Sequence, residues 1–317
     1  MLKKILNASF HSANDVTWVL LKVYVPLSIL ASLLRQFGFF DWLSPYLEPM
    51  MHIMGLPGKT SITILASFFG NVYAGIATIP AMGLTVREVT ILGIVIGFSH
   101  SLIIETGILM KLRFATYRIA LFRVILGIFA GIIANFLLPE KIEGIILNPY
   151  LKTTDEIDWL KVLLGILTTI IQIWFLVFIL QFAYDVFRNW TFSQKIKPYI
   201  NSLGNFFGLS TGGVVPWLVG LFLGIIYGSG ILIQFAKKGA VNHKDAVLIT
   251  IFLVLAHAII EDSLLFAIVG GNFWIIFISR TLIAFVILKL ISYGNFYKKL
   301  KILGVIDEEN FLTYKKN

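Results

Sequence analysis

Long runs of apolar residues, separated by short polar stretches, dominate this chain of 317 residues. A hydrocarbon core of about 30 Å requires roughly 20 helical residues. Eight runs approach or exceed that length: 16–34, 60–82, 89–112, 117–138, 159–186, 213–235, 246–269 and 273–291. Six of them predict ordinary membrane-crossing helices. The runs 60–82 and 213–235 are interrupted by Gly and Pro, and such segments form either simple helices or re-entrant hairpins whose tips stay inside the protein.

Less apolar stretches lie between these runs. Residues 41–54 and 191–207 carry scattered aromatic and polar side chains, which predicts helices lying along the membrane surface. The loop 139–158 is rich in Asp and Glu, and 293–317 is polar and basic. The N-terminus is basic but lacks a small-residue cleavage site, so we expect the first span to be an uncleaved membrane helix.

The two halves of the chain carry the same polar markers in the same order. With an offset of 157 positions, the ionisable residues of the spans correspond in three pairs: His100 with His257, Glu105 with Asp262, and Arg123 with Arg280. Such residues are rare in membrane spans, so their agreement predicts an internal repeat. The expected organisation is a first membrane repeat over 1–138, an acidic connecting loop over 139–158, a second membrane repeat over 159–292 and a basic C-terminal tail over 293–317.

The basic residues between the spans indicate how the two halves are oriented. Lys and Arg collect in the cytoplasmic loops of membrane proteins. If both Gly-rich runs return to the side from which they entered, most basic loop residues lie inside and the acidic loop lies outside. If all eight runs cross, more of the basic loop residues lie outside than inside, contrary to this rule. The first arrangement has six crossings and two cytoplasmic termini. Each half then crosses three times, so the repeats are inverted, as in many secondary transporters.

Composition supports a membrane protein and excludes several other classes. Hydrophobic residues make up 58% and charged residues 14% of the chain, whereas soluble domains average about 45–50% and about 25%. These values exclude a soluble fold, a disordered chain, a coiled coil and a nucleic-acid-binding domain, so we assign the net charge of +9 to cytoplasmic loops. The absence of cysteine excludes a disulfide scaffold, Cys-ligated zinc, an iron–sulfur cluster and a Cys nucleophile.

Short motifs in both halves resemble the nucleoside recognition, or Gate, family. They are PY at 45–46 and 198–199, GNVYAG at 70–75 with GIIYGS at 224–229, and SHSLIIETG at 99–107 with AHAIIEDS at 256–263. That family includes spore maturation proteins A and B and the membrane domain of the ferrous iron transporter B. Its scaffold is similar to the core of the concentrative nucleoside transporters, which contains two hairpins and two broken helices in inverted repeat.

The resemblance implies an all-α polytopic membrane protein with two inverted repeats, each with a surface helix, a Gly-rich re-entrant hairpin and polar-centred membrane helices. Two departures from the relatives bear on the substrate. Neither hairpin contains Asp or Glu, whereas the nucleoside transporters use an acidic hairpin residue for substrate and ion binding. The iron transporters carry Cys at their presumed pore. Nucleoside and iron are therefore both doubtful substrates.

Ionisable residues near the middle of the spans form the candidate site, because a charge at that depth is costly unless it is paired or hydrated. His257 and Glu261 are four residues apart and share a helix face, whereas His100 and Glu105 converge only if the helix is unwound between them. Gly-rich hairpin tips expose backbone N–H groups to a polar ligand. We predict that substrate or ions bind His100, Glu105, His257, Glu261 and Asp262, with Asn71 and Ser229 at the two hairpin tips. Arg123 and Arg280 are predicted to be structural partners of the carboxylates.

Purely structural roles remain an alternative for these residues. The Arg–acid pairs could serve only to hold neighbouring helices together, and the small hairpin residues could serve only to let helices pack closely. The favoured function is a non-enzymatic transporter or permease of a small polar solute in the cell membrane. Protons are the expected coupling ion, because His and buried carboxylates titrate near neutral pH. One alternative is a non-transporting component of a homo- or hetero-oligomeric membrane complex. Another is an intramembrane metal-dependent hydrolase. We expect no cofactor, no resident metal and no nucleic-acid partner.

Overall fold

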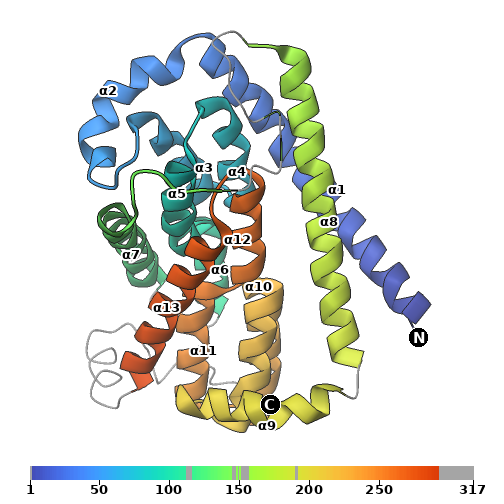
Figure 1. Ribbon diagram of the computed structural model, residues 1–317. Coiled ribbons are helices and arrows are strands. Elements are labelled where there is room, and N and C mark those ends of the chain that lie inside the picture. Colours follow the sequence, from blue (N-terminus) through green and yellow to red (C-terminus); the bar gives the residue numbers. More distant parts are fainter. Residues whose placement is uncertain are drawn as a thin grey trace. The chain divides into compact units, whose positions relative to one another are not determined.

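The computed structural model in Figure 1 describes residues 2–111, 116–144, 148, 150, 157–189 and 192–292. Within these ranges the regular secondary structure is helical and includes no strand, so the predicted all-α class is confirmed. The chain forms two compact units, and each takes residues from both halves of the sequence. Unit 1 comprises Met1–Ser101, Leu126–Asn189 and Ile260–Phe277, and unit 2 comprises Leu102–Ile125, Trp190–Ile259 and Ile278–Asn317.

Among the described residues, six helical stretches are long and apolar enough to cross a membrane, and they match the six uninterrupted runs of the sequence. Four are single helices: α1 (Leu2–Gln36), α7 (Thr116–Leu137), α8 (Trp159–Asn189) and α13 (Phe273–Ser292). Two are broken in the middle, one into α5 (Val86–Ser99) and α6 (Leu102–Lys111), the other into α11 (His243–Ala256) and α12 (Ile259–Ile268). The share of residues that are buried is 67% and 78% in the two broken spans, compared with 28–33% in the other four. Interior protein contacts, rather than a lipid-facing surface, therefore surround the breaks.

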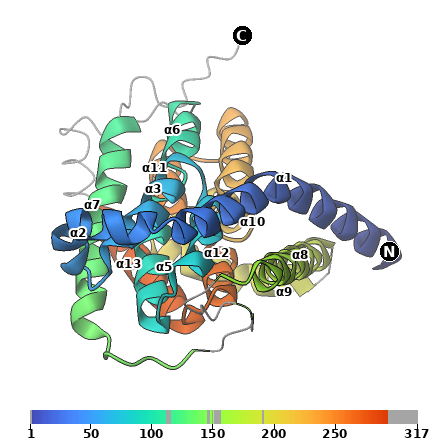
Figure 2. The same cartoon turned by 90° about the horizontal axis from the view of Figure 1, so that it is seen from above.

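Helices α1 and α8 pack along each other within unit 1, as Figures 1 and 2 show. The indole N–H of Trp174 donates to Asn14 over 2.8 Å, and the Ser9 hydroxyl donates to Asp185 over 3.2 Å. Helix α1 begins at Leu2, well before the predicted start at residue 16. Its polar first turns are held in helical form by these contacts with α8, which the local hydrophobic pattern does not reveal.

The first Gly-rich run folds as a helical hairpin in unit 1, between η1 (Gly58–Thr60) and η2 (Ile79–Met82). Its arms are α3 (Ser61–Phe69) and α4 (Val72–Thr78). The hydroxyls of Thr63 and Thr78 lie 2.7 Å apart across the arms. A Cβ on Gly75 would collide with the Ser67 hydroxyl, so glycine allows the close approach. The chain turns at Gly70, and the Asn71 side chain caps α4 by accepting the N–H of Ala74.

The second Gly-rich run, α10 (Thr211–Lys237) in unit 2, also turns at a glycine. Gly224 has φ 86° and ψ 175°, a conformation that favours glycine. Beyond it the chain approaches its own first arm, since a Cβ on Gly228 would lie 2.5 Å from the Cα of Gly220. Both interrupted runs therefore fold as hairpins rather than as straight helices.

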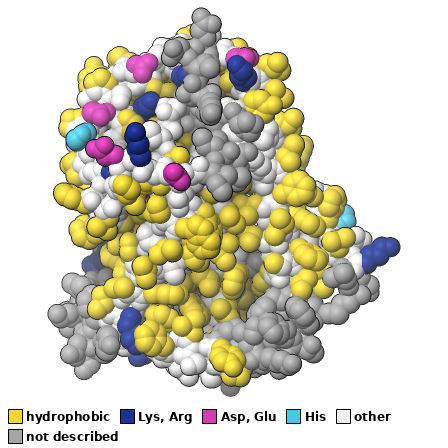
Figure 3. Space-filling view, in the orientation of Figure 1, with side chains coloured by type: hydrophobic (Ala, Val, Ile, Leu, Met, Phe, Trp, Pro, Cys, Tyr) yellow, Lys and Arg dark blue, Asp and Glu magenta, His cyan; other side chains and the backbone are white. Residues whose placement is uncertain are grey.

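Exposed apolar side chains cover the outer helices. On α13 they recur at every fourth position: Trp274, Ile278, Leu282, Val286 and Leu290. Such a stripe fits a helix that faces lipid acyl chains. Hydrophobic side chains cover much of the face in Figure 3, whereas most of its acidic side chains gather near α2 (Phe39–His52) in unit 1. Helix α2 and helix α9 (Phe192–Phe206) are the two predicted surface helices. The predicted tail 293–317 and much of the acidic loop lie outside the described residues.

Candidate functional site

Each broken span is interrupted by a histidine followed by a residue in the left-handed region. His100 ends α5 with φ −71° and ψ 165°, and His257 ends α11 with φ −68° and ψ 154°. The next residues, Ser101 and Ala258, have φ of 53° and 47°. Non-glycine residues rarely adopt this conformation, and backbone strain of this kind concentrates at functional sites. The two halves of the chain thus share the same local break at the same aligned position.

In each unit, the backbone after the histidine is tied to the Gly-rich hairpin. The N–H of Ser101 donates to the carbonyl of Ser67 over 2.8 Å within unit 1. The N–H of Ala258 donates to the carbonyl of Gly220 over 3.4 Å within unit 2. The hairpins therefore satisfy backbone groups that the broken helices leave without an intrahelical partner.

The two imidazole rings are held in the same tautomer. Nδ1 of His100 lies 3.0 Å from the carbonyl of Ile96, and Nδ1 of His257 lies 2.6 Å from the carbonyl of Leu253. A carbonyl oxygen can only accept, so Nδ1 carries a hydrogen in both rings. In the neutral form, Nε2 of each ring is consequently an acceptor that can take up a proton.

In unit 2, Glu105 lies between a guanidinium and an imidazole. One carboxylate oxygen is 2.8 Å from Nη1 of Arg123, and the other is 3.4 Å from Nε2 of His257. All three residues are buried, with exposed fractions of 2%, 1% and 5%. Because Nδ1 of His257 already carries a hydrogen, contact between Nε2 and the carboxylate is favourable only when a further proton lies on one of them. The pair is therefore built to hold one exchangeable proton.

In unit 1, a second carboxylate of the predicted set is bound by a tyrosine. The hydroxyl of Tyr73, at the start of α4, donates to Oε1 of Glu261 over 2.5 Å. Asp262 follows Glu261 and is buried. Among the described residues, no Lys, Arg or His forms an ion pair with Glu261. Tyr73 is not among the predicted site residues, although the motifs GNVYAG and GIIYGS place it opposite Tyr227 in the other hairpin. Tyr227 itself is 64% exposed.

The two predicted hairpin-tip residues make local contacts. Asn71 caps α4, and the Ser229 hydroxyl donates to the carbonyl of Ile226 over 3.1 Å. Arg280 on α13 is fully buried. His257 contacts Glu105 rather than Glu261, because the helix is broken between His257 and Glu261 and the two do not share a continuous helix face. The ligand-binding roles of these side chains stay predictions.

Comparisons with known proteins are consistent with this architecture. The family model described as nucleoside recognition, Gate, matches residues 17–113, a range that includes the first hairpin, His100 and Glu105. The uncharacterized membrane protein YvoD of Bacillus subtilis (strain 168) is 30% identical over 312 residues, which cover 95% of this chain and 97% of that protein. No solved structure matches the chain.

Proposed function

Since this chain belongs to the nucleoside recognition (Gate) family of membrane proteins, we propose that it is a secondary transporter of a small polar solute, driven by protons. The proposal places it in the cell membrane with both termini in the cytoplasm. It involves no chemical conversion of the solute and no cofactor. Six apolar spans among the described residues, two of them broken, support a membrane-embedded carrier.

The observation that carries the proposal is the buried group of Glu105, His257 and Arg123. Ionisable residues inside a membrane are costly and mark ion or proton pathways. Arg123 neutralises the carboxylate, and His257 supplies a ring nitrogen that gains or loses a proton without leaving its carbonyl partner. Protonation changes the net charge of the group by one. A solute site adjoining this group would bind with an affinity that depends on pH.

The matched breaks support alternating access by inverted repeats. Each half of the chain has a histidine at the break, a left-handed residue after it and a hairpin carbonyl that accepts the following N–H. A hairpin that moved would therefore alter the backbone next to its histidine. Inverted repeats with discontinuous helices are the arrangement in which secondary transporters place substrate and coupling ions.

The test begins with a thermal-shift screen of the purified protein against nucleosides, bases, organic anions and divalent metals. A solute that stabilises the protein is then loaded into proteoliposomes, and uptake is measured with and without an inward proton gradient. We expect gradient-driven uptake in the wild type and its loss in Glu105→Gln. The matched control is Asp15→Asn, which neutralises an exposed carboxylate on α1.

Three outcomes would contradict the proposal. Binding without flux under any gradient would favour a non-transporting component of a membrane complex. Uptake that is unchanged in Glu105→Gln would show that this carboxylate only holds helices together. Stoichiometric metal in the purified protein, with loss of activity on its removal, would favour the hydrolase alternative.

A further inference from the structure

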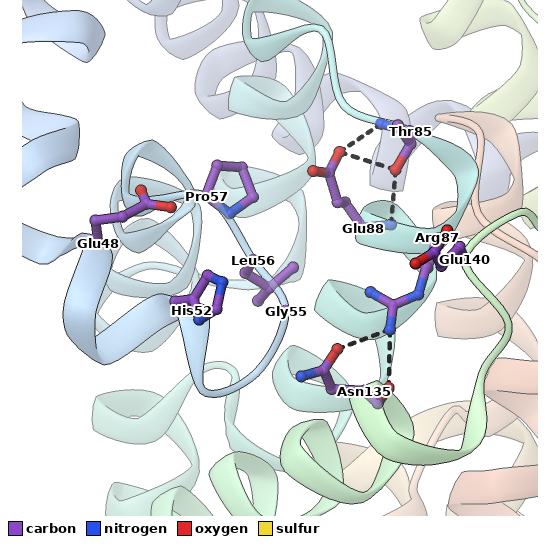
Figure 4. Close-up of a pocket in the computed structure, with 10 residues that line it drawn as sticks. All are labelled: Glu48, His52, Gly55, Leu56, Pro57, Thr85, Arg87, Glu88, Asn135 and Glu140. Carbon is purple, nitrogen blue, oxygen red and sulfur yellow. Dashed lines mark hydrogen bonds between the residues drawn. The ribbon is translucent and has the colours of Figure 1, made fainter.

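Two cavities of opposite character lie in unit 1. The polar cavity has a volume of about 510 Å³ and is lined by Glu48, His52, Arg87, Glu88, Asn135 and Glu140, among others. Figure 4 shows Glu48 and His52 on one side of it and Glu88 and Arg87 on the other. The apolar cavity has a volume of about 230 Å³ and is lined chiefly by Met, Ile, Leu and Phe side chains.

The same helices line both cavities, at different depths. On α5, Glu88 lines the polar cavity and Val95 lines the apolar one. On α7, Asn135 lines the polar cavity and Ile128 lines the apolar one. Each pair is separated by seven residues, which is about 10 Å along a helix. The polar cavity lies toward the helix ends, and the apolar cavity lies deeper in the membrane-spanning part. This order matches a lipid, whose headgroup lies above its acyl chains.

The polar cavity presents charges of both signs. Glu48 and Glu88 use Oε2 in hydrogen bonds with the backbone N–H groups of Gly58 and Thr85, at 2.6 Å and 2.7 Å. Their Oε1 atoms make no hydrogen bond to the described residues. Arg87 donates from Nη2 to Asn135 and from Nε to the carbonyl of Pro139, but Nη1 makes no hydrogen bond within the described part of the chain. A ligand with separate cationic and anionic groups complements this lining.

At the aligned position in unit 2, the carboxylate contacts a neighbouring side chain directly. Asp245 aligns with Glu88, and its carboxylate accepts both the N–H and the hydroxyl of Ser210. In unit 1, Glu88 instead turns back onto its own cap residue, Thr85, in a capping box. The Glu88 carboxylate, which lines the polar cavity, thus has a different partner from its aligned counterpart Asp245.

The apolar cavity contains one buried hydroxyl. Ser61, one of its lining residues, is 4% exposed, and its Oγ makes no hydrogen bond to the part of the chain that the structure describes. Met50, Met51 and Met54 supply flexible walls that adapt to an irregular chain. The cavity is smaller than the roughly 300 Å³ at which pockets for whole ligands begin. It therefore suits one segment of a larger molecule, with an acceptor such as an ester carbonyl near Ser61.

We propose that the two cavities together bind a phospholipid with a primary-amine headgroup, phosphatidylethanolamine. Its ammonium group lies among Glu48, Glu88 and Glu140, and its phosphate faces Nη1 of Arg87. An acyl chain enters the apolar cavity, where the Ser61 hydroxyl donates to an ester carbonyl. Phosphatidylglycerol lacks the cation and meets the carboxylates with a net negative charge. Phosphatidylcholine keeps the cation but lacks its N–H donors. This site is separate from the proposed transport site and does not depend on it.

The test measures lipid retained by purified full-length protein after exchange into mixed micelles with equal amounts of the three phospholipids. We expect phosphatidylethanolamine to be retained about fivefold or more over phosphatidylglycerol. The triple variant Glu48→Gln, Glu88→Gln, Glu140→Gln should reduce this preference to below about twofold. A matched triple control, Asp15→Asn, Asp41→Asn, Glu143→Gln, neutralises exposed carboxylates outside the cavity and should keep the preference.

Ile132→Trp fills the apolar cavity and should lower retention of all three lipids. The control Ile103→Trp, at an exposed position on α6, should leave retention unchanged. Equal retention of the three lipids by the wild type, which requires no variant to fold, would overturn the proposal. So would a full preference in the carboxylate triple variant. Retention unchanged in Ile132→Trp would show that no acyl chain occupies the apolar cavity.

Discussion

Replacing Arg123 by Gln removes the guanidinium that lies 2.8 Å from Glu105, in a place where both side chains are at least 98% buried. The carboxylate then remains buried without its cation, because Gln offers only a neutral amide. Breaking a buried ion pair from one side typically costs about 3–5 kcal/mol. For chains of 150–250 residues, each kcal/mol corresponds to about 2–4 °C of melting temperature. This chain is longer, with 317 residues, so the lower value of about 2 °C per kcal/mol applies, and we expect Arg123→Gln to melt roughly 6–10 °C lower.

The double variant Glu105→Gln, Arg123→Gln distinguishes an ion pair from two independent packing residues. Removing both charges leaves no isolated buried ion, so its loss of stability should be about 2 kcal/mol or more below the sum of the two single losses. The assay is thermal unfolding of purified protein in one detergent, followed by fluorescence at a fixed heating rate. Arg118→Gln, an exposed arginine on the same helix, is the matched control and should change stability by less than about 0.5 kcal/mol.

Additive losses would refute this account, because they would mean that Arg123 and Glu105 do not interact. A single Arg123→Gln variant as stable as the wild type would refute it as well, since a buried carboxylate cannot lose a neighbouring guanidinium without cost. An equal loss in Arg118→Gln would show that the assay responds to net charge and not to the buried pair.

Three other changes have defined outcomes. In this Cys-free chain, single cysteines at 143 and 272 should react with an impermeant maleimide on intact cells, and cysteines at 113, 188 and 237 should not; the reverse pattern would contradict cytoplasmic termini. His100→Gln with His257→Gln should flatten the pH dependence of solute-induced stabilisation between pH 5.5 and 8, which we expect to exceed about threefold in the wild type, while His11→Gln, at an exposed position, should leave it intact. Gly224→Ala should lower the melting temperature because alanine is strained at φ 86°, whereas Gly230→Ala, where a Cβ has open space, should be tolerated.

Much of the fold follows from local pattern. The six spans are predictable because a helix that crosses lipid must be apolar over its whole length, and each uninterrupted run satisfies that condition. The hairpins can be predicted from the positions of glycine. The turn at Gly224 has a positive φ, which favours glycine, and the close approach of the arms at Gly75 is possible because glycine has no side chain. The early start of α1 could not be predicted, because its stabilising partners on α8 lie more than 150 residues away.

The residue types of the candidate site could also be predicted, because ionisable groups are conspicuous in apolar runs. Their pairings could not. The four-residue spacing of His257 and Glu261 suggests one helix face only if the helix is continuous, and the left-handed Ala258 breaks it. Glu105 then meets His257 from the other half of the sequence, and Glu261 meets Tyr73. Such contacts depend on how distant segments pack, which spacing within one segment does not encode.

The geometry at His257 bears on how a proton could be linked to a moving hairpin. Its Nδ1 is held by the carbonyl of Leu253, and the N–H of the next residue, Ala258, is held by the carbonyl of Gly220 in the hairpin. Only Nε2 is left to respond to a change of protonation, and it faces Glu105. A gain or loss of the shared proton alters that contact while Nδ1 keeps its partner. In the proposed transporter, the backbone of Ala258 is therefore one link between the break and the hairpin. Substitution of Ala258 by glycine, which adopts a positive φ without strain, should leave the histidine's own contacts in place and weaken the dependence of transport on the proton gradient.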